Sequence, residues 1–170
     1  AVPYYGFLAG SRTGYIVLSS FFEGCARDVR RAFIALKDQG MTSLVLDLRG
    51  NPGGLMNEAV DILSMFIPKG TEVVSTKGKL KQASSVSKTG REPLDLDMPI
   101  AVLVNGNSAS ASEIVAGSLQ DLDRAVIIGE RTFGKGLVQV IRDLPYGGSL
   151  KVTTSKYYIP SGRCVQAINY

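Results

Sequence analysis

The chain has 170 residues, within the usual size of one folded domain, which is roughly 100–200 residues. Hydrophobic residues make up 45% and charged residues 20% of it, a balance typical of a globular protein rather than a disordered one. It contains no histidine, which excludes Ser-His-Asp and Cys-His catalysis, histidine zinc sites and imidazole general bases from within this chain. A hydrolase with this sequence would have to move its proton with another side chain.

The net charge of +4 comes from interspersed charges, and we expect no nucleic-acid partner. Residues 77–88 carry four lysines and no acid. This segment could be a phosphate or membrane patch, but a solvated hairpin is favoured. Cys25 and Cys164 have neither metal-ligand spacing nor a disulfide framework, and Cys25 falls on an apolar helical face. We therefore expect no metal site.

Hydrophobic periodicity predicts strands that alternate with helices. The predicted strands are residues 15–20, 43–48, 72–76, 80–86, 100–104, 125–128, 137–144 and 150–158, of which 72–76 and 80–86 form a polar hairpin. The predicted helices are residues 24–39, about 55–67 and about 110–119. This order indicates an α/β fold with a largely parallel sheet flanked by helices, plus a β-rich segment. Functional loops in such sheets lie beyond the carboxyl ends of the strands, where three glycine- or serine-rich loops occur.

The first loop, residues 47–54, reads Asp-Leu-Arg-Gly-Asn-Pro-Gly-Gly and lies between a predicted strand and a predicted helix. Its glycines have no side chains to cover the backbone, and exposed N–H groups at a helix N-terminus can bind an anion or an oxyanion. A tight turn that needs positive φ angles explains the same glycines. On its own, the loop favours the turn.

The second loop, residues 105–113, reads Asn-Gly-Asn-Ser-Ala-Ser-Ala-Ser-Glu and opens a predicted helix. A serine at this helix start lies at the positive end of the helix dipole, which would stabilise developing negative charge. The pattern Ser110-x-x-Glu113 is equally a capping box, in which both residues serve the helix start. The segment alone does not decide between a nucleophile and a cap.

The third loop, residues 129–136, reads Gly-Glu-Arg-Thr-Phe-Gly-Lys-Gly and matches the phosphate-loop pattern Gly-x-x-x-x-Gly-Lys. Phosphate loops need Ser or Thr after the lysine to hold Mg²⁺, and they run into a helix. Here Gly136 follows the lysine and a strand is predicted next. Nucleotide binding is therefore disfavoured.

Lys135 fits a different role. We expect Phe133, Leu137 and Val138 to bury it partly, and burial lowers a lysine pKa because it disfavours the ammonium form. A neutral lysine can act as general base for a serine in place of histidine, and Gln139 could orient the amine. The alternative for a lone lysine in a glycine loop is a solvated turn, but the absence of histidine favours a Ser–Lys pair.

Together, segments 47–54, 106–114 and 129–139 resemble the three signature segments of the C-terminal processing peptidases, also called tail-specific proteases. They occur in the family's order, and the similarity extends from about residue 15 to residue 162. The family consists of serine endopeptidases with a Ser–Lys dyad, related in fold to crotonase and Clp-type proteases. The resemblance implies a layered fold of that kind and a reaction without a metal or organic cofactor.

The resemblance also implies roles for single residues. Ser110, rather than Ser108 or Ser112, matches the family's nucleophile. Lys135 matches its general base, and Gln139 matches the glutamine that supports the lysine.

The oxyanion donors implied by the resemblance are the backbone N–H of Ala111 and that of Gly53 or Gly54, between which the sequence does not choose. The positions that match residues supporting the family's site are Glu113, Asp121 and Thr132.

These matches predict the protease core of a serine endopeptidase that cleaves near protein C-termini through an acyl-enzyme. Two alternatives stay open: a catalytically silent module that binds peptides or hydrophobic ligands on the same fold, and a crotonase-like acyl-CoA enzyme. The expected partner is a protein or peptide substrate. The resemblance further implies a PDZ domain in the full-length chain and a periplasmic or cell-envelope location.

The segment begins at Ala1 without an initiator Met or a signal peptide, and it shows no PDZ domain. We expect residues 1–170 to be one domain excised from a longer precursor.

Overall fold

The structure of the chain is a computed structural model that describes residues 1–79 and 81–167. Its strands are β1 (Tyr4–Phe7), β2 (Thr13–Val17), β3 (Ser43–Asp47), β4 (Glu72–Gly78), β5 (Ser85–Lys88), β6 (Ile100–Val104), β7 (Val126–Gly129), β8 (Leu137–Asp143) and β9 (Ser149–Tyr158). Its helices are α1 (Cys25–Asp38), α2 (Met56–Leu63) and α3 (Ala111–Asp121), with a short 3₁₀ turn, η1 (Lys81–Ala83).

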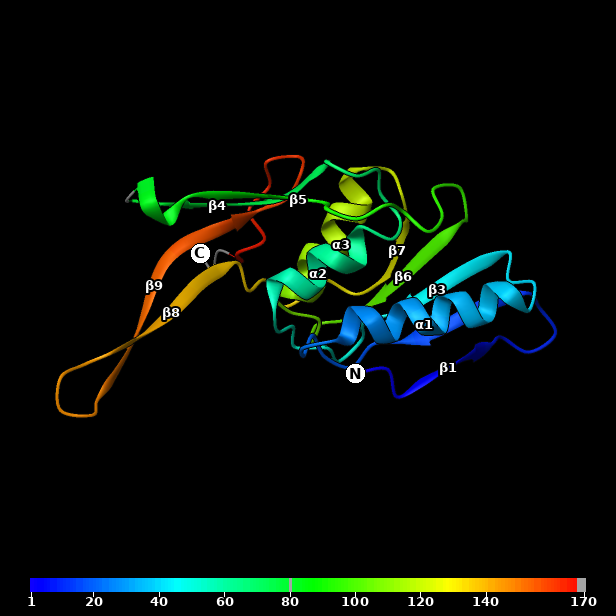
Figure 1. Cartoon of the computed structure of the whole chain (residues 1–170), viewed down its shortest axis with the longest axis horizontal. Coiled ribbons are helices and arrows are strands. Elements are labelled where there is room, and N and C mark those ends of the chain that lie inside the picture. Colours follow the sequence, from blue (N-terminus) through cyan, green and yellow to red (C-terminus); the bar gives the residue numbers. More distant parts are fainter. Residues whose placement is uncertain (80, 168–170) are drawn as a thin grey trace.

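The first sheet has the strand order β1-β2-β3-β6-β7. Strands β2, β3, β6 and β7 are parallel, and β1 pairs antiparallel with β2 at one edge. Because parallel strands end at a common edge of the sheet, the loops after β3, β6 and β7 leave the sheet on the same side (Figure 1).

The core lies on one face of this sheet. Neighbouring strands place Ile16, Leu46 and Val102 side by side there, and all three are fully buried. Burying side chains of this size stabilises the fold by roughly 1.5–3 kcal/mol each. Helix α1 packs against the sheet, and its Phe33 meets Phe66 edge-on with ring centroids 5.4 Å apart. The predicted apolar helical face is buried as expected: Cys25, Val29, Phe33 and Leu36.

The second sheet is antiparallel, with the order β5-β4-β9-β8. Helix α3 contacts both β7 and β4, so it lies between the two sheets, and the β8–β9 hairpin extends away from the body (Figure 1). The predicted α/β class, with a largely parallel sheet and a β-rich segment, is confirmed. The lysine-rich segment lies in the predicted β4–β5 hairpin, where the Lys77 amine is 4.8 Å from the ring centre of Tyr158.

Several boundaries differ from the prediction. Strand β1 is not predicted, because Tyr-Tyr-Gly-Phe shows no alternation. Strand β2 covers residues 13–17 rather than 15–20, since the chain then turns to pair Phe21 N–H with the Gly53 carbonyl at 3.0 Å. Helix α2 ends at Leu63 rather than near residue 67. Strand β5 is shorter than the predicted 80–86, and residue 80 lies outside the described residues.

Within residues 1–79 and 81–167, no helix is both long enough and apolar enough to cross a membrane.

Candidate active site

The three loops identified from the sequence meet at one edge of the parallel sheet. The Gly50 N–H of the first loop donates to the Asn105 side-chain oxygen of the second at 3.0 Å. The Phe133 N–H of the third loop donates to the Ser108 carbonyl of the second, also at 3.0 Å. Segments far apart in the sequence are therefore joined directly by hydrogen bonds.

The charged residues of the first loop anchor it to the sheet. The Arg49 guanidinium pairs with the Asp47 carboxylate at 2.7 Å, and the Tyr15 hydroxyl donates to the same carboxylate. Burial favours the neutral form of Asp47, but the hydrogen bonds from Arg49 and Tyr15 outweigh it and lower the pKa of Asp47. The hydrogen bond from Tyr15 to Asp47 joins β2 to β3 at the start of the loop, and the ion pair with Arg49 holds the loop to the same carboxylate.

Gly53 and Gly54 allow the first loop to approach its neighbours closely. Gly53 is buried with φ +97°, and a Cβ there would lie 2.6 Å from the Ala109 oxygen and 2.9 Å from the Ala111 nitrogen. A Cβ at Gly54 would lie 2.4 Å from the Phe21 oxygen. A side chain at either position would push the loops apart.

The two glycine amides differ in what they bind. The Gly53 N–H donates to Asn51 Oδ1 at 2.9 Å. Among the described residues, neither the Gly54 N–H nor the Ala111 N–H has a hydrogen-bond acceptor. Ala111 is the first residue of α3, where helical amides lack an intrahelical partner. The free donors in the two loops are thus those of Gly54 and Ala111.

The three serines of the second loop have different environments. Ser108 and Ser112 are fully buried, and their hydroxyls donate to the Leu48 carbonyl at 2.8 Å and to the Asn51 carbonyl at 2.9 Å. Ser110 is half-buried, and apart from the capping-box contact in which it accepts the Glu113 N–H, its hydroxyl has no hydrogen-bond partner within the described part of the chain. Ser110 is therefore the serine of this loop whose hydroxyl is available to a ligand.

Ser110 has a strained backbone, with φ 56° and ψ −113°. This backbone conformation costs a residue with a Cβ about 1–3 kcal/mol of strain. Such strain occurs at sharp turns that expose a nucleophile. The predicted capping box forms with Glu113, whose Oε2 accepts the Ser110 N–H at 2.8 Å. The cap and the exposed serine are thus compatible with each other.

Glu113 also binds the third loop. Its Oε1 accepts the Gly134 N–H at 2.6 Å, and its Oε2 accepts the Lys135 N–H at 2.8 Å. The carboxylate is almost fully buried, with 4% exposure. Because Oε2 also holds the Ser110 N–H, the backbone nitrogens of Ser110 and Lys135 both lie 2.8 Å from one oxygen.

The prediction that apolar side chains bury Lys135 is wrong. Lys135 is exposed, and the Phe133 side chain points largely to solvent with 61% exposure. Within residues 1–79 and 81–167, no hydrogen bond joins the Lys135 amine to Ser110. The strand predicted after Gly136 is present as β8, so the loop does not run into a helix as a phosphate loop would.

Gln139 does not bind Lys135. It lies exposed on β8, and its Nε2 donates to Thr153 Oγ1 of β9 at 3.4 Å.

Asp121 and Thr132 take different positions relative to Ser110. Asp121 ends α3, roughly 16 Å along the helix from Ser110, and it accepts the Ser161 N–H at 2.9 Å and pairs with Arg163. Burial opposes its ionisation, but these bonds outweigh burial and lower the pKa of Asp121. Thr132 is half-buried and, with Glu113, lines a cavity of about 180 Å³ behind the third loop.

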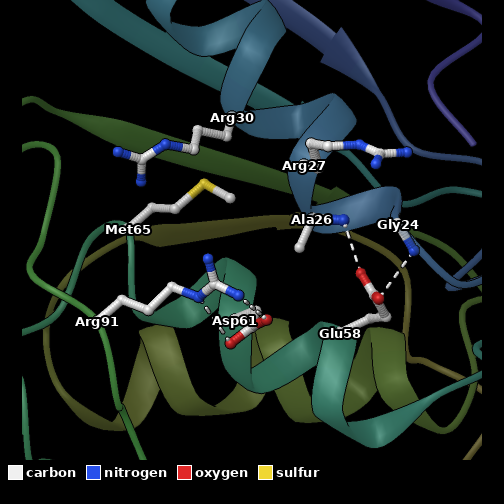
Figure 2. A pocket seen from close by; sticks show the side chains of 8 residues that line it. All are labelled: Gly24, Ala26, Arg27, Arg30, Glu58, Asp61, Met65 and Arg91. Atoms are coloured by element: carbon white, nitrogen blue, oxygen red, sulfur yellow. Dashed lines mark hydrogen bonds and ion pairs between the residues drawn. The ribbon is translucent and has the colours of Figure 1, made fainter.

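A separate cavity of about 230 Å³ lies between α1 and α2, and no predicted site residue lines it (Figure 2). Its buried acid, Glu58, accepts the N–H groups of Gly24 and Ala26 at 2.8 Å each, and so caps the start of α1. Arg91 pairs with Asp61 at 3.1 Å across the same cavity. Glu58 thus joins α2 to the start of α1.

Sequence reasoning missed Asn51, Ser108 and Ser112 as residues that connect the loops. All three are fully buried and hydrogen-bonded to backbone atoms. The available signal was a short amide or hydroxyl side chain within glycine-rich turns, where such groups commonly bind the nearby backbone.

Three comparisons place the chain among known proteins. The model of the family "Peptidase family S41" matches residues 12–169. A carboxyl-terminal-processing protease of Synechocystis sp. is 42% identical over 151 residues, which cover 89% of this chain and 35% of that protein. The chloroplastic carboxyl-terminal-processing peptidase 3 of Arabidopsis thaliana is 40% identical, covering 89% and 29%. The chain thus spans about a third of the length of these curated relatives.

A solved structure of a photosystem II D1 C-terminal processing protease superposes with a TM-score of 0.83. It is 37% identical and covers 91% of this chain and 39% of that chain. This similarity confirms the layered α/β fold implied by the motifs.

Proposed function

Because the chain belongs to peptidase family S41, we propose that it is the catalytic core of a serine endopeptidase that cleaves near protein C-termini. The observation that carries the proposal is the shared Glu113 carboxylate, which holds the Ser110 and Lys135 amides at 2.8 Å each. The carboxylate thereby joins the loop that carries the accessible Ser110 to the loop that carries Lys135. Among the described residues, Lys135 has no ion-pair partner.

In the proposed reaction, Ser110 Oγ attacks the peptide carbonyl carbon while the neutral Lys135 amine takes its proton. The tetrahedral oxyanion is stabilised by backbone N–H groups of the first loop and of Ala111. Collapse expels the amine of the C-terminal fragment, which receives the proton from Lys135, and leaves an acyl-Ser110 ester. Water then hydrolyses this ester, again with Lys135 as base.

The supporting residues have separate roles in this proposal. Glu113 fixes the two loops, and Thr132 lines the same cavity as Glu113. Gln139 orients the amine once the Lys135 side chain turns from solvent toward Ser110. Asp121 acts at a distance, because it holds the segment at Ser161 against the end of α3.

The substrate is proposed to be a protein or peptide with an apolar C-terminal tail, and residues 1–170 one protease domain of a longer chain that includes a PDZ domain. A periplasmic or cell-envelope location rests on the family resemblance, while the Arabidopsis relative is named as chloroplastic. Fractionation of cells, with a marker enzyme for each compartment, tests the location.

The decisive experiment treats the full-length protein with a fluorophosphonate probe and with a peptide bearing an apolar tail. We expect labelling and cleavage that are both absent in Ser110→Ala. Peptide binding without labelling or cleavage would instead favour a silent binding module, and thioester turnover would favour an acyl-CoA enzyme.

A further inference from the structure

Asn51 is held by hydrogen bonds from both its side chain and its backbone, and some of them join the first loop to the second loop, which carries Ser110. Its side chain is fully buried, donates from Nδ2 to the Leu18 carbonyl at 2.7 Å and accepts the Gly53 N–H on Oδ1 at 2.9 Å. Its own carbonyl accepts the Ala109 N–H at 3.0 Å and the Ser112 hydroxyl at 2.9 Å. Asn51 therefore contacts the residues on both sides of Ser110.

The side chain of Asn51 determines which glycine amide is free. It occupies the Gly53 N–H, so that group is not available to a substrate oxygen. The Gly53 carbonyl accepts the Phe21 N–H at 3.0 Å. Since the C=O and N–H of a trans peptide point in opposite directions, the Gly54 N–H points away from Phe21.

The first loop lies against the second at Gly53, the residue that precedes Gly54. Gly53 lies against this part of the second loop, because a Cβ on it would come within 2.8 Å of Ser110 Cβ and 2.9 Å of the Ala111 nitrogen. In the described residues, the Gly54 and Ala111 amides have no acceptor. Two N–H groups without an acceptor thus belong to residues next in the chain to this contact: Gly54 follows Gly53, and Ala111 follows Ser110.

We propose that Asn51 is a positioning residue for the oxyanion hole: it holds the Gly53 amide out of the reaction and sets the Gly54 amide opposite that of Ala111. This inference rests on the proposed serine-peptidase function. It assigns Asn51 a role in transition-state stabilisation, exerted through the backbone, while Asn51 itself touches no reacting atom.

The first test compares Asn51→Ala with Ser118→Ala in the full-length protein. Ser118 is a matched control, because it is also fully buried and its hydroxyl donates to one carbonyl, that of Val73 in β4, at 2.8 Å. Loss of one oxyanion donor lowers kcat about 10²–10³-fold, and we expect a fall of that order in Asn51→Ala with KM within about threefold. Ser118→Ala should keep kcat near the wild-type value.

A fall in kcat alone does not separate weaker binding of the transition state from a general structural defect of the site. We therefore measure inhibition by a peptide boronic acid, which forms a tetrahedral adduct on serine, beside inhibition by the cleaved product peptide. Asn51→Ala should weaken the boronate at least tenfold more than the product. Equal weakening of both, or an unchanged kcat, overturns the inference.

A crystal structure of the wild-type boronate adduct tests the same point without a variant, should Asn51→Ala not fold. The expected oxyanion lies within hydrogen-bond distance of the Gly54 and Ala111 nitrogens, with Gly53 still bound to Asn51. An adduct bound by Gly53 overturns the inference and leaves the proposed function standing. A wild-type protein that forms no Ser110 adduct and cleaves no peptide overturns both.

Discussion

Glu113 and Lys135 are joined by a hydrogen bond of 2.8 Å from the Lys135 backbone N–H to Glu113 Oε2, the oxygen that also accepts the Ser110 N–H. The bond concerns the backbone of Lys135 and leaves its amine free to move. The buried carboxylate thus fixes the backbone positions of Ser110 and Lys135. In the proposed mechanism, the lysine side chain spans the distance that remains to the serine hydroxyl.

Replacing Glu113 by Gln should separate the two loops. The amide group cannot accept all three N–H donors, so at least one buried donor loses its partner, which costs about 1–3 kcal/mol. We expect a loss of that size in urea unfolding and a fall in peptide cleavage of at least about tenfold, the effect of 1.4 kcal/mol on a rate. The control is Glu130→Gln, an exposed acid of the third loop, which should change neither. Equal effects of the two substitutions would contradict the assigned role.

The strained backbone of Ser110 predicts an order of stability among inactive variants. Ser110→Gly and Ser110→Ala should both lose cleavage, but the glycine variant should be more stable by about 1 kcal/mol, since glycine adopts φ 56° without strain and alanine is a poor helix cap. Thermal unfolding of the two variants measures this difference. An alanine variant as stable as the glycine variant would show that Ser110 carries no strain.

Lys135 should be essential for cleavage and dispensable for folding. Its side chain is exposed and forms no ion pair among the described residues, so Lys135→Arg should change stability by no more than about 0.5 kcal/mol. The variant should be inactive, because a guanidinium does not deprotonate to act as a base. Lys151→Arg, at an exposed lysine of β9, serves as the control with unchanged activity. Substantial cleavage by Lys135→Arg would rule out the lysine-base mechanism.

The two cysteines should differ in reactivity. Cys25 is fully buried, and burial together with the nearby Glu58 charge raises the pKa of its thiol to about 12. Its thiolate therefore forms only at strongly alkaline pH, and iodoacetamide at pH 8 should leave Cys25 unmodified until the protein is unfolded. Cys164 is half-buried beside the third loop and should react first. Peptide mapping by mass spectrometry reads out both sites.

Asp95 should stabilise the fold at neutral pH and lose this effect in acid. Burial opposes its charge, but bonds from Lys37 at 2.7 Å and from the Met98 and Asp97 amides lower its pKa to about 2. Because the folded-state pKa lies below the unfolded value of about 3.9, the contribution is complete above that value and disappears as pH falls toward 2.

The measurement for Asp95 compares the unfolding free energies of wild type and Asp95→Asn from pH 7 to pH 2. Their difference should shrink between about pH 4 and pH 2. Asp97→Asn removes the same charge from an exposed neighbour and should show little such dependence. A pH-independent difference for Asp95→Asn would falsify the assigned pKa shift.

The sequence by itself determined the fold class, the strand-and-helix order and the three loops that meet at the sheet edge. Period and turn residues are local properties, so the apolar face of α1 and the strands β3, β6 and β8 could be read from short windows. The family could also be recognised from the sequence, because the three motifs occur in the family's order with the family's residues.

Only the tertiary structure decided which groups in those loops are free. Ser108, Ser110 and Ser112 look alike in sequence, yet two of them bind carbonyls from the first loop more than 50 positions away in the chain. Gly53 and Gly54 also look alike in sequence, yet Asn51 accepts the N–H of Gly53 alone. The prediction that Lys135 is partly buried is wrong for the same reason. The exposure of a side chain depends on which distant segments pack around it, and a neighbour in sequence such as Phe133 can point away from it.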